Sequence, residues 1–374
     1  GRGGAGREQR ALRAERFTMP LARGRVQVRA NARWRGGGSS MEYRRLGKAG
    51  MRVSEIALGS WITAGGDYDQ SNTIRVHLKA FDLGINTFDT ADIYNRGVAE
   101  EIVGKAVKQL KRSDLVIATK CRWPLGNNPN EDGLSKKHIF EACHASLKRL
   151  ETDYIDLYQF HRPDEHTPIE ESVGAIGQLL RAGKILYWGL SNYNPQQTAD
   201  MINAARALGV EAPVSHQPKY NMFRRDVEEA LLPYCRREGL GLVVYSPLEQ
   251  GLLTGKYLKK GKLPPDSRFA KNRKLVEAHM VEYNLTALAA LQNIARKHKL
   301  TLTQLALAWI LREPGVSACI VGATTLEQIE QNAQAGGVKL DESCVAEIEA
   351  ILQRRWARIQ IEDNQKVLKD VKGI

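Results

Sequence analysis

Short apolar runs that are typical of β-strands recur along this chain at nearly regular intervals. Segments with helical periodicity lie between them; within residues 136–150, for example, Ile139, Cys143, Leu147 and Leu150 fall on one helical face. Spacings of 26 to 41 residues between most runs fit one strand, one helix and two short connections. The first run covers residues 55–59, and the other seven end near Asp89, Lys120, His161, Ser191, Gln217, Ser246 and Thr324.

Eight strands that alternate with helices predict an α/β fold. Two architectures alternate in this way, the (β/α)8 TIM barrel and the doubly wound open sheet. The count of eight favours the barrel. So does the polar residue at the end of nearly every run, because barrels build their sites at the carboxyl ends of their strands. We therefore expect a barrel, preceded by a short hairpin that turns at residues 48–50.

One interval, between the seventh and eighth runs, is too long for a single strand and helix. We expect it to contain an extra loop at about residues 249–280, followed by two helices. A loop of this length inside a compact domain is usually functional. The barrel is expected to cover residues 41–352, with a charged tail at residues 353–374.

The net charge of +13 is concentrated in the first 40 residues, which contain ten Arg, no Lys and two Glu and so carry +8. This Gly/Arg-rich leader has no sustained apolar period and is expected to be disordered. Its "GRGGAG" matches a dinucleotide-binding motif only by letter, because no strand precedes it. We interpret the leader as an upstream artefact before a native start at Met41, with an organellar transit peptide and an RNA-binding arm as the alternatives.

The rest of the composition excludes several classes of protein. No apolar run is long enough to span a membrane. Five scattered cysteines without C-x-x-C spacing argue against disulfides and against a zinc site, and they fit a reducing compartment such as the cytoplasm. Cys121 is expected to be a buried, inert thiol, and we expect no metal.

Four polar residues suggest chemistry at the strand ends: Asp89, Tyr94, Lys120 and His161. Tyr94 could protonate a carbonyl oxygen, with the Lys120 ammonium lowering the phenol pKa and Asp89 holding that ammonium. His161 could orient the carbonyl group. Taken singly, each residue is more simply a helix cap or a solvated side chain, so the hypothesis depends on the four lying together.

The motifs around these residues resemble the aldo-keto reductases: "FDTADIY", "IATK", "FHRPD", "WGLSNY" and "YSPLEQGLLTGKY". The stretches "GLSKKHI" and "LKRLETDYIDLYQFHRPDEHTPIEE" are similar to the branch that contains the β-subunits of voltage-gated potassium channels. The resemblance implies that Asp89, Tyr94, Lys120 and His161 are the catalytic tetrad. Channel subunits tend to have Asn at the position of His161, so the histidine favours an active enzyme over a regulatory subunit.

The resemblance also implies an NADP(H) cofactor across the barrel mouth, covered by the long loop. Ser191, Asn192 and Gln217 would bind the nicotinamide amide, and Arg268 would bind the 2′-phosphate, which favours NADPH. Gln331 stands where the family usually has Glu, which predicts weaker adenine contacts. The full expected set of cofactor residues is Ser60, Trp61, Asp89, Ser191, Asn192, Gln217, Tyr245, Ser246, Pro247, Leu248, Gln250, Gly251, Lys256, Ser267, Arg268, Gly322, Thr324, Gln328, Gln331 and Asn332.

These expectations favour an NADP-dependent reductase of small aldehydes and ketones. Trp61, Tyr94, Trp123 and His161 are expected to line the substrate pocket. The alternative is a redox-sensing NADP(H)-binding subunit in which catalysis is incidental. We expect a small carbonyl substrate, no nucleic-acid or membrane partner, and a homo-oligomer, for which the branch implies a tetramer.

Overall fold

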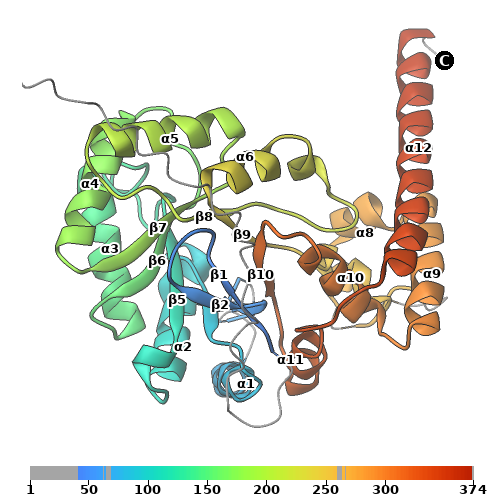
Figure 1. Ribbon diagram of the computed structural model, residues 1–374, viewed down its shortest axis with the longest axis horizontal. Helices are drawn as coiled ribbons and strands as arrows, with labels where there is room; N and C mark the ends of the chain where they lie inside the picture. Colours follow the sequence, from blue (N-terminus) through green and yellow to red (C-terminus); the bar gives the residue numbers. More distant parts are fainter. Residues whose placement is uncertain (1–40, 62, 65–68, 259–262, 266, 373–374) are drawn as a thin grey trace, which may run out of the picture. The chain divides into compact units, whose positions relative to one another are not determined.

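The computed structural model describes residues 41–61, 63–64, 69–258, 263–265 and 267–372. The expected leader, residues 1–40, lies outside these residues. Eight parallel strands form a closed barrel in which neighbours along the chain are neighbours in space, and the last strand closes against the first (Figure 1). The predicted TIM barrel is therefore confirmed. Its strands are β3 (Ile56–Gly59), β4 (Thr87–Asp89), β5 (Val116–Cys121), β6 (Ile155–Phe160), β7 (Ile185–Ser191), β8 (Ser215–Gln217), β9 (Gly241–Val244) and β10 (Val316–Val321).

Helices cover the outside of the barrel, between successive strands (Figure 1). Local sequence explains where several of them begin; α5 and α10 start at the capping boxes of Asn194 with Gln197 and of Thr301 with Gln304. The helices before β10 are α1 (Gln70–Asp82), α2 (Val98–Val107), α3 (Lys136–Leu150), α4 (Ile169–Arg181), α5 (Pro195–Ala207), α6 (Leu231–Glu238), α7 (Arg268–Lys271), α8 (Arg273–His279), α9 (Glu282–Lys297) and α10 (Leu302–Leu311), with 3-10 turns η1 (Tyr94–Gly97), η2 (Arg112–Asp114), η3 (Asp226–Glu228) and η4 (Glu249–Thr254).

Alternation along each strand separates two layers of core. On β5, Ile117 packs in the large cluster that the helices share, while Val116 and Ala118 belong to a smaller cluster with Leu157 of β6 and Ile320 of β10. Because successive side chains of a strand point to opposite faces, the smaller cluster fills the barrel interior.

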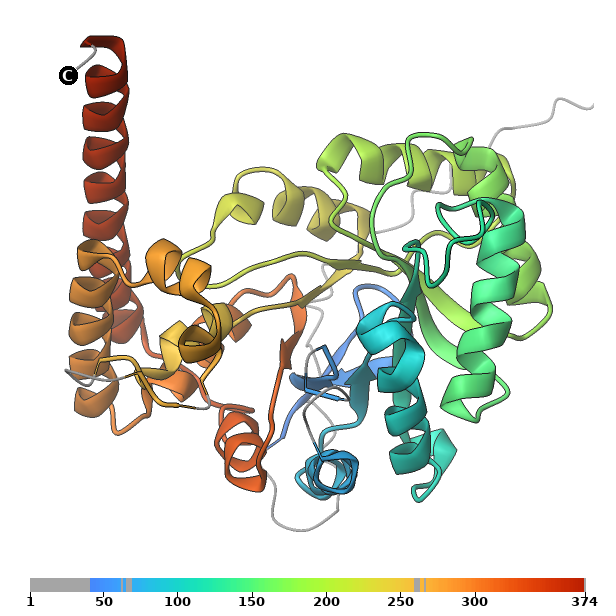
Figure 2. The same ribbon diagram turned by 180° about the vertical axis from the view of Figure 1, so that it is seen from behind.

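The long interval between β9 and β10 contains η4, α7, α8, α9 and α10, so the two expected helices follow an irregular segment with short helical turns. After β10 come α11 (Leu326–Ala333) and α12 (Glu342–Lys372). α12 lies beside α9 in both views (Figures 1 and 2). It continues past residue 352, so residues that the sequence marked only as a charged tail are helical as far as Lys372.

A small antiparallel hairpin precedes the barrel, as expected. Its strands β1 (Tyr43–Arg45) and β2 (Arg52–Ser54) pair Tyr43 with Ser54. Leu46 and Val53 of the hairpin belong to the interior cluster of the barrel. Gly47, with a φ of 58°, lies so close to β9 that a Cβ would be 2.2 Å from the Gly239 carbonyl oxygen and 2.5 Å from the Gly241 nitrogen. Contact with the start of β9 means that the hairpin closes the amino-terminal end of the barrel.

This close approach predicts that Gly47→Ala destabilises the protein by about 2 to 4 kcal/mol, because a methyl group adds both a left-handed backbone penalty and overpacking. The free energy of unfolding in urea measures the effect. Gly50→Ala, in the same turn, is the control: nothing lies within 4 Å of its Cβ position, so its effect should stay within about 0.5 kcal/mol. Equal stability of the two variants would contradict the role given to the hairpin.

Candidate active site

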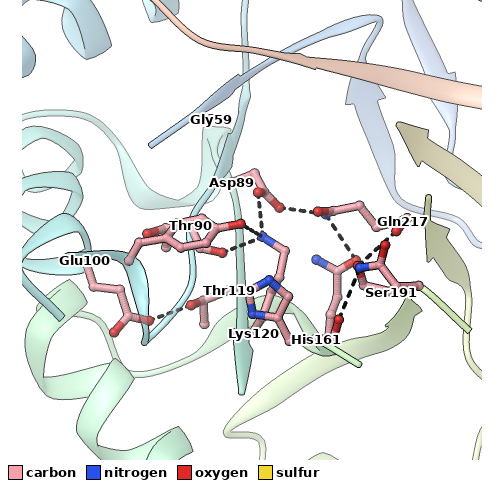
Figure 3. Close-up of polar contacts among 12 residues, drawn as sticks. Gly59, Asp89, Thr90, Glu100, Thr119, Lys120, His161, Ser191 and Gln217 are labelled. Carbon is pink, nitrogen blue, oxygen red and sulfur yellow. Dashed lines mark hydrogen bonds and ion pairs between the residues drawn. The ribbon is translucent and has the colours of Figure 1, made fainter. Parts of the chain in front are cut away.

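Polar residues replace apolar ones along the inward-facing positions as each strand approaches its carboxyl end. On β5 the inward series is Val116, Ala118 and Lys120; on β6 it is Leu157 and Gln159, with His161 one residue beyond the strand. Asp89 ends β4 and pairs in register with Ala118 of β5. The strand geometry therefore brings the expected residues to one end of the barrel (Figure 3).

The Lys120 ammonium is the centre of this cluster. Its side chain is fully buried, and its Nζ donates to Asp89 Oδ1 at 2.6 Å, to the Thr90 carbonyl oxygen at 2.7 Å and to Tyr94 Oη at 3.3 Å. Burial by itself would lower the lysine pKa, but the charges and hydrogen bonds of Asp89 and Tyr94 outweigh burial and raise the pKa of Lys120. Lys120 is therefore a charged donor beside the Tyr94 hydroxyl.

Tyr94 keeps its proton. Burial raises its pKa above the ordinary value, and Asp89 acts in the same direction; the Lys120 charge lowers the pKa but does not compensate. Lys120 therefore acts on the Tyr94 pKa in the expected direction, but burial, which the sequence does not record, outweighs it and the net shift is upward. Tyr94 is therefore a neutral phenol whose hydroxyl lies beside the Lys120 ammonium.

The His161 ring packs edge-on against the Tyr94 ring, with 5.7 Å between ring centroids. It also packs edge-on against the Trp123 ring, with 6.5 Å between centroids. Burial, together with the charges of Lys120 and Arg162, lowers the pKa of His161 to about 2, so the imidazole is neutral. Its buried Nδ1 has no hydrogen-bond partner within the described part of the chain. Three of the expected pocket residues thus meet here. The fourth, Trp61, is half exposed and lies 5.6 Å below the Arg268 guanidinium.

Gln217, which was expected only at the nicotinamide, also binds Asp89, and the sequence did not indicate this contact. Its Nε2 donates to Asp89 Oδ2 at 2.8 Å, so both oxygens of Asp89 are engaged, one by Lys120 and one by Gln217 (Figure 3). Behind Lys120, the buried Glu100 accepts from Thr119 Oγ1 and from Arg149 Nε. In the sequence Glu100 stands beside Glu101, and only the packing of α2, which buries the first and exposes the second, identifies Glu100 as this support.

Ser191, Asn192 and Tyr245, all expected at the nicotinamide, form one chain of hydrogen bonds. Tyr245 Oη donates to Asn192 Oδ1 at 2.8 Å, and Asn192 Nδ2 donates to Ser191 Oγ at 2.8 Å and to the His161 carbonyl oxygen at 3.3 Å. Asn192 has a φ of 60°, a conformation that Asn tolerates better than most residues. These bonds fix the orientation of the Asn192 amide beside His161.

The turn after β9 contains Ser246, Pro247, Leu248, Gln250 and Gly251, the expected pyrophosphate segment. A Cβ on Gly251 would lie 2.9 Å from Lys256 Nζ, so the lysine side chain is close to the turn. Arg268, at the start of α7, donates to the Gln250 side chain. The structure thus brings both expected cations, Lys256 and Arg268, to this turn.

The residues expected at the adenosine end lie after β10. Thr324 donates to the Gln328 side chain from its backbone nitrogen at 2.8 Å and from its hydroxyl at 3.2 Å, and Asn332 Nδ2 donates to the Gly322 carbonyl oxygen at 3.5 Å. Gln331 is exposed on α11. Ser267 caps α7, and the buried Ser60 hydroxyl has no hydrogen-bond partner among the residues that the structure describes.

Other features bear on the class of protein. All five cysteines are buried and free, and burial raises the pKa of the Cys121 thiol, which fits an inert residue. Across the described ranges, no His, Cys, Asp and Glu residues group in a way that could hold a metal ion. Within the same residues, no helix combines the length and the apolar character of a membrane span.

Comparison with known proteins agrees with this geometry. The sequence model of the Aldo/keto reductase family matches residues 55–353. A probable voltage-gated potassium channel subunit beta from Arabidopsis thaliana is 42% identical over 325 residues, which cover 85% of this chain and 98% of the relative. Similarly named proteins from Oryza sativa subsp. japonica and Schizosaccharomyces pombe are each 41% identical, over 86% and 79% of this chain and 99% and 88% of the relative. The chain belongs to the aldo/keto reductase family.

Proposed function

We propose that this protein reduces small aldehydes and ketones to alcohols with NADPH. The observation that carries the proposal is the neutral Tyr94 hydroxyl, 3.3 Å from a buried ammonium and packed against a neutral imidazole. Such a group can give a proton to a carbonyl oxygen, and the neighbouring charge stabilises the anion left behind. Membership of the family supports an oxidoreductase.

The residues at the barrel mouth fit a nicotinamide cofactor. The Asn192 amide and the Ser191 hydroxyl would hold its carboxamide, and the buried, unpartnered hydroxyl of Ser60 offers a further polar contact. Lys256 and Arg268 offer positive charge for its phosphates, and Arg268 supports NADPH over NADH. When bound, the cofactor supplies the hydride that no side chain can supply.

The chain's own residues supply the proton transfer. His161, as a neutral imidazole, donates a hydrogen bond that orients the carbonyl oxygen. Tyr94 donates its proton to that oxygen as negative charge develops on it. Lys120 stabilises the phenolate, and Asp89, held by Gln217, keeps the ammonium in place. Burial of the cluster strengthens each of these interactions, because little water competes for them.

Removing the Tyr94 hydroxyl tests this mechanism. We expect Tyr94→Phe to lower kcat for NADPH-dependent reduction of 4-nitrobenzaldehyde by about 10²- to 10⁴-fold, the usual contribution of a general acid. NADPH binding, measured by fluorescence titration, should change little. Tyr43→Phe is the matched control, because its hydroxyl donates to the Gly84 carbonyl oxygen in the hairpin region and should be catalytically silent. Full turnover by Tyr94→Phe would exclude the mechanism.

The neutral state of His161 has a consequence for stability. Its pKa of about 2 in the folded protein lies far below the unfolded value of about 6.5, so the unfolded chain takes up the proton first as pH falls. We expect the free energy of unfolding to drop between about pH 7 and pH 5, and to drop less in His161→Gln. Urea unfolding at both pH values measures the difference. Identical pH dependence in the two proteins would mean that His161 is not buried in its neutral form.

A redox-sensing regulatory role is the second candidate. Its support is the likeness to relatives named as channel β subunits over nearly their full length. A sensor of this kind is expected to retain NADP⁺ through purification and to show negligible multiple turnover. An enzyme should release the product and turn over repeatedly. Cofactor content by absorbance, followed by a carbonyl panel with NADPH and NADH, separates the two.

A further inference from the structure

The turn that follows β9 is held in a strained conformation. Ser246, Glu249, Gln250 and Gly251 have φ values of 52°, 42°, 58° and 89°, and only the last is a glycine. Left-handed conformations are costly for the other three, because Cβ approaches the following carbonyl group. Strain of this kind persists only where the surrounding structure over-determines the backbone, and it concentrates at functional sites.

The Glu249 side chain connects the turn to its surroundings through several hydrogen bonds. It is 5% exposed, and it accepts from Lys219 Nζ at 2.9 Å, from Asn221 Nδ2 and from the His279 ring at 3.0 Å. Asn221 Nδ2 also donates to the Ser246 carbonyl oxygen at 2.9 Å, so one amide contacts both the first residue of the turn and Glu249. Lys219 and Asn221 lie just after β8, and His279 ends α8. Glu249 therefore joins the turn to the barrel on one side and to the long loop on the other.

The carboxylate stays ionised in this setting. Burial alone would raise its pKa, but the bonds from His279, Lys219 and Asn221 outweigh burial and lower the pKa of Glu249 to about 2. Its negative charge is directed inward, onto these donors. On the other side of the turn, Lys256 approaches Gly251. The N–H groups of Glu249 and Gly251 donate to the carbonyl oxygens of Ser246 and Leu248 within the turn, so the positive charge that suits this turn to a phosphate group comes from Lys256 and from Arg268.

The long loop has further contacts with the same region. Arg268 donates to Gln250, and the Phe269 ring stacks on Tyr257 with 4.2 Å between centroids. Phe269 also lies 5.5 Å from the His279 ring. The bond between Glu249 and His279 is thus the polar part of a packed contact between the loop and the turn.

We propose that Glu249 is a positioning residue for the cofactor: its buried carboxylate holds the turn at residues 246–251 in its phosphate-binding conformation and joins that turn to α8. This inference rests on the proposed NADP(H) function. Glu249 touches neither substrate nor cofactor in this role. Its loss should weaken cofactor retention and leave the chemistry at Tyr94 unchanged.

The rate at which NADPH leaves the protein tests the proposal. In a stopped-flow chase with excess NADP⁺, Glu249→Gln should release NADPH about tenfold faster than the unaltered protein, because a turn that is no longer preorganised binds the phosphates less tightly and such affinity losses appear mainly in the dissociation rate. Single-turnover reduction of 4-nitrobenzaldehyde by the NADPH-loaded variant should stay within about twofold of the unaltered rate.

The matched control is Glu55→Gln. Glu55 is a buried glutamate that accepts from Arg44 Nε at 2.6 Å and from the Gly337 nitrogen at 2.9 Å, just before β3 at the opposite end of the barrel. It should lose stability without faster NADPH release. His279→Gln removes the partner of Glu249 on α8 and should also speed NADPH release. It serves as the test variant if Glu249→Gln folds poorly.

The outcomes separate the two proposals. Faster release in Glu249→Gln or His279→Gln, with normal release in Glu55→Gln, supports the inference. If Glu249→Gln and His279→Gln both release NADPH at the unaltered rate, the role proposed for Glu249 is overturned and the NADP(H) function stays intact. Equal acceleration in all three variants also overturns it, because the effect would then follow general destabilisation. No NADPH binding by the unaltered protein would overturn the proposed function and this inference with it.

Discussion

A buried ammonium is the constraint around which the candidate site is organised. Moving a charged amine out of water is costly unless charge and hydrogen bonds compensate for it. Lys120 meets this requirement with three acceptors: the Asp89 carboxylate, the Thr90 carbonyl oxygen and the Tyr94 hydroxyl. All three come from β4 and the turn after it, so the site depends on β4 and β5 pairing in one register. A shift of one residue would direct Lys120 into the helical layer.

Residues around the site hold its members in place through further hydrogen bonds. Gln217 engages the second oxygen of Asp89, and Glu100 holds Thr119 and Arg149 behind β5. The turn after β9 has a comparable arrangement, in which Glu249 accepts from three donors. In both places the charge of a buried carboxylate is satisfied by donors of the same chain, and the neighbouring side chains are thereby held in place. Preorganisation of this kind lets a site stabilise charge without moving during the reaction.

The architecture was accessible from the sequence because its signals are local. Apolar runs at regular spacing, with helical segments between them, predicted eight strands, and the structure closes them into a barrel. The four catalytic candidates could be placed together because parallel strands bring their carboxyl ends to one face. Period-two alternation then directs Lys120 and Gln159 inward and Thr119 and Phe160 outward.

The sequence could not predict pKa values or long-range side-chain contacts, because both depend on which residues surround a group in the folded protein. Lys120 lowers the Tyr94 pKa as expected, but burial, which no motif records, raises it by more. The contact of Gln217 with Asp89 joins residues that are 128 positions apart, and the bond between Glu249 and His279 joins a turn to a loop helix. The sequence by itself determined the order of strands and the residue types at their ends, because patterning and turn chemistry act over a few residues. Only the tertiary structure decided which charges are desolvated and which side chains compensate for them, because burial is set by the closing of the whole barrel.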